Sequence, residues 1–383
     1  MDFSLSEEQQ LLKDSVDRFV REEYELESRR KLVASDDGFS RDHWKMMAEL
    51  GWLGVALPEE FGGIGGGPVD TMVIMEGVGS GLIVEPYLSS VVLGGGFLTE
   101  AGSEAQKTEL LPKLAAGELM LSFAYVEAQS RFDLNDVELS AKADGGGYVL
   151  NGAKGVVLNA ASADKIIVAA RTAGGSRDSS GITLFLVDNG AAGLSRRDYP
   201  TVDGLRASEL SFENVAVGAD AVLGEVDNGL PVMEKVVGKA IAALAAESVG
   251  CMQVLHETTN EYLKTRKQFG VPLSKFQVLQ HRMVDMFMEY EQARSMCYMV
   301  TLKCEDEDAI ERAKAVSAAK VQIGKSGRFV GQQAVQLHGG MGMTEELNVG
   351  HYFKRLTMID TMFGNKDYHL RRFANLSGSA AAA

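Results

Sequence analysis

The chain has 383 residues, of which 45% are hydrophobic and 24% charged, and its formal net charge is −15 at pH 7. This length allows two or three domains with sizeable cores. The acidic balance argues against nucleic acid or an anionic membrane surface as the main partner, although a local basic pocket can still hold an anionic small ligand. The N-terminal stretch MDFSLSEEQQLL lacks a signal-peptide pattern, and no uncharged apolar run reaches about 18 residues, so we expect a cytoplasmic protein without a transmembrane helix.

Residues 1–119 are predicted to form a helical domain. Ser6 and Gln9 make a capping box, and apolar residues at helical spacing follow it. Further helices are expected near residues 41–50, 69–77, 87–98 and 103–116. Gly51 has the character of a helix C-terminal residue, and the glycine-rich loop at 57–67 interrupts the pattern.

Residues 120–226 are predicted to form a β domain, because the hydrophobic period shortens towards two and no long helical pattern intervenes. The expected strands are 121–125, 138–143, 148–150, 165–170, 182–187 and 209–212. Glycine-rich turns separate them. We expect a small barrel or sandwich.

Residues 227–376 return to helical periodicity. Long segments near 230–266, 274–304, 308–337 and 346–375 are joined by short loops, which is typical of an antiparallel four-helix bundle. Residues 377–383 are predicted to be a disordered tail. The chain is thus expected to be an α+β multidomain protein with a helical, a β and a second helical domain.

The cysteines and histidines do not indicate a metal site. Cys251, Cys297 and Cys304 show no metal-binding or redox spacing, so we expect buried thiols in a reducing compartment. His338 precedes a glycine turn, but no second ligand stands at a suitable spacing.

Four motifs occur in order along the chain: LGWLGVALPEEFGG at 50–63, GYVLNGAK at 147–154, TRKQFGVPLSKFQVLQHRMVDM at 265–286 and QLHGGMGMTEE at 336–346. Together with the domain order, they make the chain resemble the acyl-CoA dehydrogenase family. The resemblance implies FAD bound across a subunit boundary. A base would remove the α-proton of an acyl-CoA thioester while the flavin takes hydride from the β-carbon, giving trans-2-enoyl-CoA. Electron-transfer flavoprotein is the implied electron acceptor.

The resemblance also implies which residues contact the adenosine and pyrophosphate of FAD: Arg266, Gln268, Phe269, Leu273, Phe276, Gln336, Gly339 and Gly340. A guanidinium can bind a pyrophosphate bidentately, and glycines let backbone N–H groups approach a phosphate or ribose. A solvated charge at a helix end and a plain glycine turn are the alternative interpretations of Arg266 and of residues 339–340.

The flavin-ring half departs from the family pattern. The threonine of Ala-x-Thr-Glu-Pro is Val126 here, and Arg131-Phe132 replaces the small pair that follows it. The family's Trp-Ile-Thr is Val-Val-Leu at 156–158, and its Tyr-Glu-Gly-Thr is Met-Phe-Gly-Asn at 362–365. Valine and leucine side chains cannot donate hydrogen bonds to a flavin edge.

The catalytic base is absent from both positions that the family uses, which hold Phe363 and Ala240 here. Glu247 follows Ala240 by seven residues, which is two helical turns or about 10 Å on the same helix face. A glutamate in this apolar run is a candidate base if desolvation raises its pKa. The alternative is a glutamate paired within the bundle or at a subunit contact.

Three hypotheses about function follow. In the first, the chain resembles the small subunit of heteromeric bacterial acyl-CoA dehydrogenases acting on pimeloyl-CoA or steroid side-chain CoA thioesters, and it supplies the adenosine half of the FAD site to a large subunit in an α₂β₂ complex. In the second, it is a self-sufficient homotetramer that uses Glu247. In the third, it is a non-catalytic interaction protein that kept the fold. The acyl-chain specificity cannot be deduced from the sequence.

Overall fold

The computed structural model describes residues 4–380. They form two compact units, each assembled from separate stretches of the chain. The helical unit takes the described residues up to Lys31, residues 68–83 and the residues from Ile241 onward. The sheet unit takes residues 32–67 and 84–240. The predicted domain boundaries at 119/120 and 226/227 stay a prediction.

The helices appear mainly where the periodicity predicts them. Their bounds are α1 Glu7–Glu23, α2 Leu26–Ala34, α3 Arg41–Glu49, α4 Pro68–Gly81, α5 Gly96–Ala101, α6 Glu104–Ala115, α7 Gly229–Thr265, α8 Gln277–Lys303, α9 Ala309–His338, α10 Val349–Thr361 and α11 Lys366–Ala380. The capping box at α1 is confirmed, since Ser6 Oγ accepts from the Gln9 N–H and Gln9 Oε1 accepts from the Ser6 N–H. The predicted helix at 87–98 is a π-helix, Tyr87–Gly95, that continues into α5.

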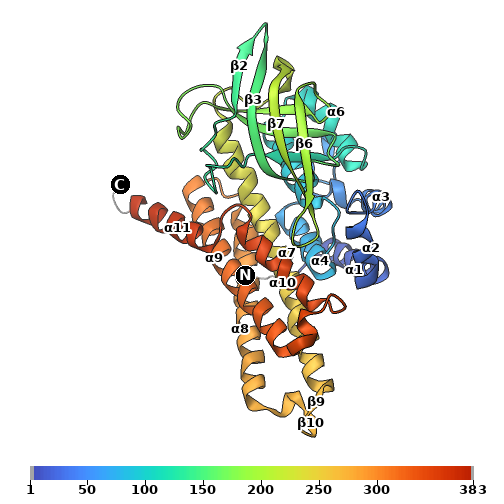
Figure 1. The fold of residues 1–383 in the computed structure, drawn as a ribbon. Coiled ribbons are helices and arrows are strands. Elements are labelled where there is room, and N and C mark those ends of the chain that lie inside the picture. The colour runs from blue at the N-terminus through green and yellow to red at the C-terminus, as the bar shows by residue number, and fades with distance from the viewer. Residues whose placement is uncertain (1–3, 381–383) are drawn as a thin grey trace. The chain divides into compact units, whose positions relative to one another are not determined.

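The β domain is one eight-stranded sheet. Its strands are β1 Leu121–Ala124, β2 Ser140–Asp144, β3 Gly147–Leu158, β4 Lys165–Arg171, β5 Ile182–Asp188, β6 Leu194–Pro200, β7 Arg206–Gly218 and β8 Val222–Leu223. They run in the order β6-β7-β3-β2-β4-β5-β8, and β1 pairs in parallel with β4. Figure 1 shows β6, β7, β3 and β2 side by side. The sequence missed β6 and β8. Most of β6 is exposed, so it carries no alternating apolar signal.

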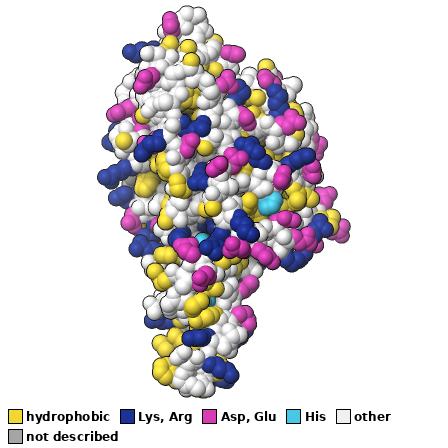
Figure 2. Space-filling model, turned by 45° about the vertical axis from the view of Figure 1, so that its right-hand side comes forward, with side chains coloured by type: hydrophobic (Ala, Val, Ile, Leu, Met, Phe, Trp, Pro, Cys, Tyr) yellow, Lys and Arg dark blue, Asp and Glu magenta, His cyan; other side chains and the backbone are white. Residues whose placement is uncertain are grey.

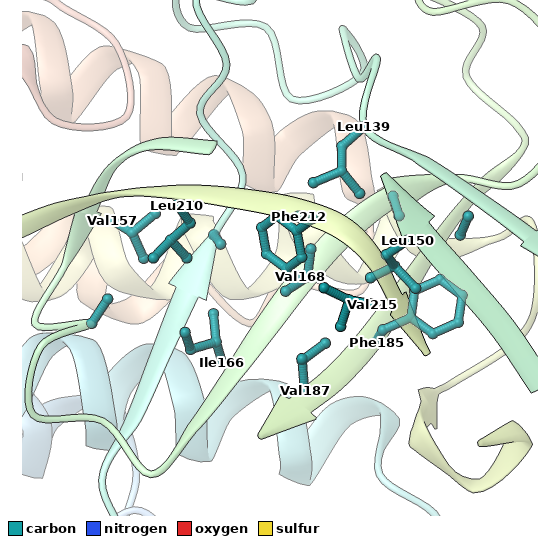
Figure 3. Packing of buried hydrophobic residues seen from close by; sticks show 14 residues of the cluster. Leu139, Leu150, Val157, Ile166, Val168, Phe185, Val187, Leu210, Phe212 and Val215 are labelled. Carbon is teal, nitrogen blue, oxygen red and sulfur yellow. The ribbon is translucent and has the colours of Figure 1, made fainter. Parts of the chain in front are cut away.

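The sheet core is a cluster of buried aliphatic and aromatic side chains. Figure 3 shows Leu150, Val168, Phe185, Phe212 and Val215 pointing toward one another from different strands. β3 is twice interrupted in its pairing with β7, between Leu150 and Gly152 and between Lys154 and Val157. These irregularities turn part of β3 outward, a usual effect of a β-bulge.

In the helical unit, α4 and α7 cross at glycines. A Cβ added at Gly79 would lie 2.0 Å from the Glu247 carbonyl oxygen, and one at Gly250 would lie 2.0 Å from the Glu76 carbonyl oxygen. Only glycine permits this backbone approach. The hydroxyl of Tyr352 and the guanidinium of Arg29 donate to carbonyls at the end of α4, Ser80 O and Leu82 O. They satisfy carbonyls that the helix end leaves free.

The last predicted bundle helix is two helices, α10 and α11. The chain breaks between them because Phe363 and Gly364 adopt φ values of 55° and 110°. Lys320 Nζ donates to three carbonyls at this break, those of Ile359, Asp360 and Gly364, at 2.7–2.9 Å. α11 continues to Ala380, so residues 377–380 are helical rather than part of a disordered tail, and residues 381–383 lie outside the described residues. Among the described residues, no helix is both long and apolar enough to span a membrane.

Arg171, at the end of β4, joins two loops of the sheet unit. Its guanidinium donates to the carbonyls of Asn135 and Val137 in one loop and of Ser176, Asp178 and Ser180 in the other. The donor–acceptor distances are 2.7–3.3 Å. All three guanidinium nitrogens are therefore used.

We predict that Arg171→Met lowers the free energy of unfolding by about 3 kcal/mol, because one buried and four part-buried hydrogen bonds to carbonyls are lost together. Urea denaturation measures this loss. Arg197→Met is the control, since Arg197 pairs with Glu209 on an exposed strand and its loss should cost less than about 1 kcal/mol. Equal losses of unfolding free energy in the two variants would contradict the role of Arg171 in joining the two loops.

Glu76 of α4 is a mostly buried carboxylate that accepts no side-chain hydrogen bond from the described residues. Burial raises its pKa, against the opposing attraction of Lys13 on α1 and Arg294 on α8, while Asp17 adds to the rise. The folded state therefore holds this proton to a higher pH than the unfolded state. The associated stability is present at low pH and is lost as the pH rises through the folded-state pKa.

We predict that Glu76→Gln is more stable than the wild type at pH 8 and equal to it at pH 4. Unfolding midpoints measured at both pH values test this expectation. Glu49→Gln, at an exposed position beside Lys45, should show no such pH dependence. A pH-independent difference for Glu76→Gln would count against the pKa assignment.

Candidate functional site

Glu247 lies in α7 and forms a buried ion pair with Arg355 of α10. Arg355 Nε donates to Glu247 Oε1 at 2.5 Å, and Arg355 Nη2 donates to Oε2 at 2.8 Å. The two side chains are 3% and 7% exposed. This bidentate arrangement engages both carboxylate oxygens with a fixed positive charge. The structure thus favours the paired interpretation of Glu247 over its use as a base.

The two positions that the family uses for the base carry no proton acceptor in their side chains. Ala240 is fully buried, and Phe363 is buried with a φ of 55°. The Phe363 carbonyl is 2.9 Å from His369 Nε2. Burial lowers the pKa of His369 to about 3, so this imidazole stays neutral and donates to the carbonyl. The segment around Phe363 is therefore held by structural hydrogen bonds.

The first segment with predicted cofactor residues lies where α7 ends. A small hairpin follows, with β9 at Lys267–Gln268 and β10 at Val271–Pro272. Its turn places Phe269 and Gly270 at φ values of 55° and 82°. A left-handed phenylalanine is unusual, and the Phe269 side chain is also 89% exposed. A strained and exposed residue of this kind is a candidate for contact with a ligand or a protein partner.

The other predicted residues of this segment are also accessible. Arg266 and Gln268 are exposed, while Leu273 and Phe276 are half-buried. The rings of Phe269 and Phe276 meet edge to face, with centroids 6.1 Å apart. The Leu273 N–H donates to the Arg266 carbonyl at 2.9 Å, which ties the hairpin to the end of α7. A cationic and an aromatic group are thus both available at this hairpin.

The second predicted segment lies where α9 ends. Gln336 is exposed in the last turn, and Gly339 and Gly340 begin a short 3₁₀ helix, Gly339–Met343. No atom lies within 4 Å of a Cβ built at either glycine, so both backbones face open space. Backbone N–H groups at such a turn can approach an anionic ligand closely.

The two segments meet through Tyr262 of α7 and His338 of α9. Their ring centroids are 4.3 Å apart, and the Tyr262 hydroxyl donates to the His338 carbonyl at 3.4 Å. The hairpin lies at the lower end of the helical unit in Figure 1, and hydrophobic and basic side chains both reach the surface there in Figure 2. Met341 and Met343 are 46% and 77% exposed. The sequence did not predict this pairing, although Tyr262 stands one helical turn before Arg266.

Most residues predicted to have lost flavin contacts, those at 126, 131–132 and 156–158, lie in the sheet unit, whereas residues 362–365 lie in the helical unit. Val156 is 48% exposed and has a φ of 49° at the second irregularity of β3. The Val126 carbonyl accepts from the Gly155 N–H at 2.8 Å. None of the side chains at 126, 156 and 158 can donate a hydrogen bond.

Glu127 and Lys154 form a buried ion pair beside these positions, with Oε1 and Nζ 2.6 Å apart. Burial lowers the pKa of Lys154 to about 8, although Glu127 acts in the opposite direction. Glu127 also accepts from the backbone N–H groups of Glu138 and Leu139. The pair therefore has a structural role in fixing the end of β1. The residues present fit the adenosine and pyrophosphate of FAD, but these positions do not fit its flavin ring.

We predict that Arg355→Met lowers the free energy of unfolding by about 3–5 kcal/mol, because it leaves Glu247 charged and buried without a partner. The double variant Glu247→Leu/Arg355→Met should recover most of this loss. Lys13→Met is the control, since the exposed Lys13–Asp17 pair is worth less than about 1 kcal/mol. Denaturant unfolding of the three variants checks the prediction, and a small loss in Arg355→Met would contradict it.

Comparison with known proteins covers nearly the whole chain. Three family models match: the acyl-CoA dehydrogenase N-terminal domain at residues 6–118, the middle domain at 122–215 and the C-terminal domain at 227–376. The mitochondrial isovaleryl-CoA dehydrogenase of Oryza sativa subsp. japonica is 32% identical over 368 residues, which are 94% of this chain and 88% of that protein.

Two solved structures have the same fold over almost their full lengths. One is a variant of the steroid ACAD Tcur3481-Tcur3483, with 29% identity, a TM-score of 0.90 and coverage of 99% of this chain and 100% of that one. The other is the ChsE4-ChsE5 complex from Mycobacterium tuberculosis, with 26% identity, a TM-score of 0.87 and 99% coverage of both chains. The predicted fold class is confirmed. The chain therefore belongs to the acyl-CoA dehydrogenase family, whose members oxidise acyl-CoA thioesters with FAD.

Proposed function

We propose that this chain is the small subunit of a heteromeric acyl-CoA dehydrogenase, supplying the adenosine half of each FAD site in an α₂β₂ complex. The observation that carries the proposal is the contrast between an exposed arginine and a buried, paired glutamate. Arg266 is exposed beside the hairpin that follows α7, whereas Glu247 is buried and bound by Arg355. The chain thus has residues that could bind the cofactor, but neither Glu247 nor the family's two base positions supply a free base.

Each proposed contact follows from the chemistry of its group. Arg266 would neutralise the pyrophosphate, because a guanidinium binds such oxygens bidentately. Phe269 and Phe276 would pack against the adenine, and the open backbones of Gly339 and Gly340 would approach the ribose or a phosphate. When bound, FAD supplies the hydride acceptor of the reaction. The base and the donors to the flavin ring would come from the large subunit.

The substrate is an acyl-CoA thioester, and we place it in the class of steroid side-chain or dicarboxylyl thioesters. Two of the similar solved structures support a complex of unlike chains, since their names pair two proteins and one names a steroid ACAD. We take electron-transfer flavoprotein as the electron acceptor. A homotetramer using Glu247 would have to break the bond between this carboxylate and Arg355.

The test is to co-express the chain with the product of any adjacent dehydrogenase-like gene and to measure FAD bound in the purified complex. We predict one FAD for each pair of unlike chains. Arg266→Ala should weaken FAD retention about tenfold or more, because a charged contact to the pyrophosphate is lost. Lys264→Ala is the matched control: Lys264 is exposed on the same helix end and pairs with Glu261.

Unchanged flavin content in Arg266→Ala would overturn the assignment of this residue. Acyl-CoA oxidation by the chain without any partner, abolished by Glu247→Gln, would overturn the small-subunit proposal. Such a result would establish the homotetramer instead.

A further inference from the structure

We propose that Tyr262 and His338 are positioning residues that hold the two cofactor-binding segments in register. This inference rests on the proposed adenosine site and adds to it two residues outside the predicted contacts. Tyr262 precedes Arg266 in α7, and His338 precedes Gly339 at the end of α9. The pair therefore connects the segment with the cation to the segment with the open backbone.

Tyr262 is rigidly linked to Arg266. The Arg266 N–H donates to the Tyr262 carbonyl at 2.8 Å, so Arg266, the first residue after α7, is tied to the last turn of that helix. The Tyr262 ring lies against His338 with an interplanar angle of 30° and a centroid distance of 4.3 Å. Aromatic rings in such contact resist lateral displacement. A shift of the Tyr262 ring would thus move the start of the hairpin that carries Phe269.

His338 is oriented from the other side. Its ring Nδ1 is 2.8 Å from the Ala334 carbonyl oxygen, and because a carbonyl can only accept, Nδ1 carries the proton. Burial lowers the pKa of His338, so the ring stays neutral and Nε2 is an acceptor. Nε2 is buried and has no hydrogen-bond partner among the described residues. A purely apolar ring would fill the same space without this unpaired acceptor.

The hydroxyl of Tyr262 adds a second link. It donates to the carbonyl of His338, which is both the last residue of α9 and the N-cap residue of the 3₁₀ helix Gly339–Met343. The next residue is Gly339, with φ 59° and ψ −137°, a conformation available to glycine. Tyr262 therefore caps α9 at the point where the backbone turns toward open space. Ring contact and cap together set the distance between Arg266 and the Gly339–Gly340 turn.

The experiment measures the dissociation constant of ADP, a probe for the adenosine and pyrophosphate portion of FAD, by calorimetry on the full chain. Temperatures are kept well below the unfolding midpoint of each variant. We expect Tyr262→Leu and His338→Leu each to raise the dissociation constant of ADP about tenfold. The double variant should bind ADP no more weakly than either single variant, because each substitution already breaks the contact between the two rings. Tyr262→Phe keeps the ring and should lose less affinity.

His256→Leu is the matched control. His256 lies in the same helix α7 and makes a ring contact with Phe287 of α8, with centroids 5.7 Å apart. Its replacement should lower the unfolding midpoint and leave ADP affinity at the wild-type value. Wild-type ADP affinity in Tyr262→Leu would overturn the positioning role.

Arg266→Ala separates this inference from the proposed function. If Arg266→Ala weakens ADP binding and Tyr262→Leu does not, the positioning role of Tyr262 fails and the proposed adenosine site stands. If the wild type does not bind ADP, or Arg266→Ala has no effect, the proposed adenosine site itself fails.

Discussion

The ion pair between Glu247 and Arg355 is the interaction on which the rest of the account depends. It joins α7 to α10 inside the helical unit, next to the glycine crossing that brings α4 against α7. A buried carboxylate is tolerable only with such a partner, because desolvation would otherwise cost several kcal/mol. The pairing also settles what Glu247 offers chemically: its oxygens are held by a permanent cation. Because Glu247 is paired and Ala240 and Phe363 hold the family's base positions, we propose that the base comes from another chain.

The proposed binding residues are found in a contrasting environment. They lie at helix ends and in a tight hairpin, where backbone groups are left free and side chains reach solvent. Phe269 has a left-handed backbone and a nearly fully exposed ring, an arrangement that costs free energy in the isolated chain and that a ligand or partner covering the ring would offset. Tyr262 and His338 contact each other at the ends of α7 and α9, close in sequence to these exposed groups. The buried interior of the helical unit thus holds the charge pair, and the residues proposed to bind the dinucleotide lie at exposed helix ends.

Much of the fold could be predicted from the sequence because local signals and the fold agree, as at the Ser6 capping box and in the buried strand β4. Strand β6 was not predicted, because most of its residues face solvent and give no alternating apolar pattern. The break between α10 and α11 was not predicted, because it depends on Phe363 in a left-handed conformation and on Lys320, which is distant in sequence. The same limit applies to the site. The motifs indicated residues 266–276 and 336–340, but Arg355 is 108 positions from Glu247 and no local pattern marks it as the partner.

The most direct measurement of the central claim is the flavin absorbance, per chain, of this protein purified without any partner. The account predicts little bound flavin, because Val126, Val156 and Leu158 give the ring no side-chain donors and the adenosine half alone retains the cofactor weakly. One FAD per chain in a homomer would contradict it. That result would show that the backbone around these three positions suffices to hold the ring.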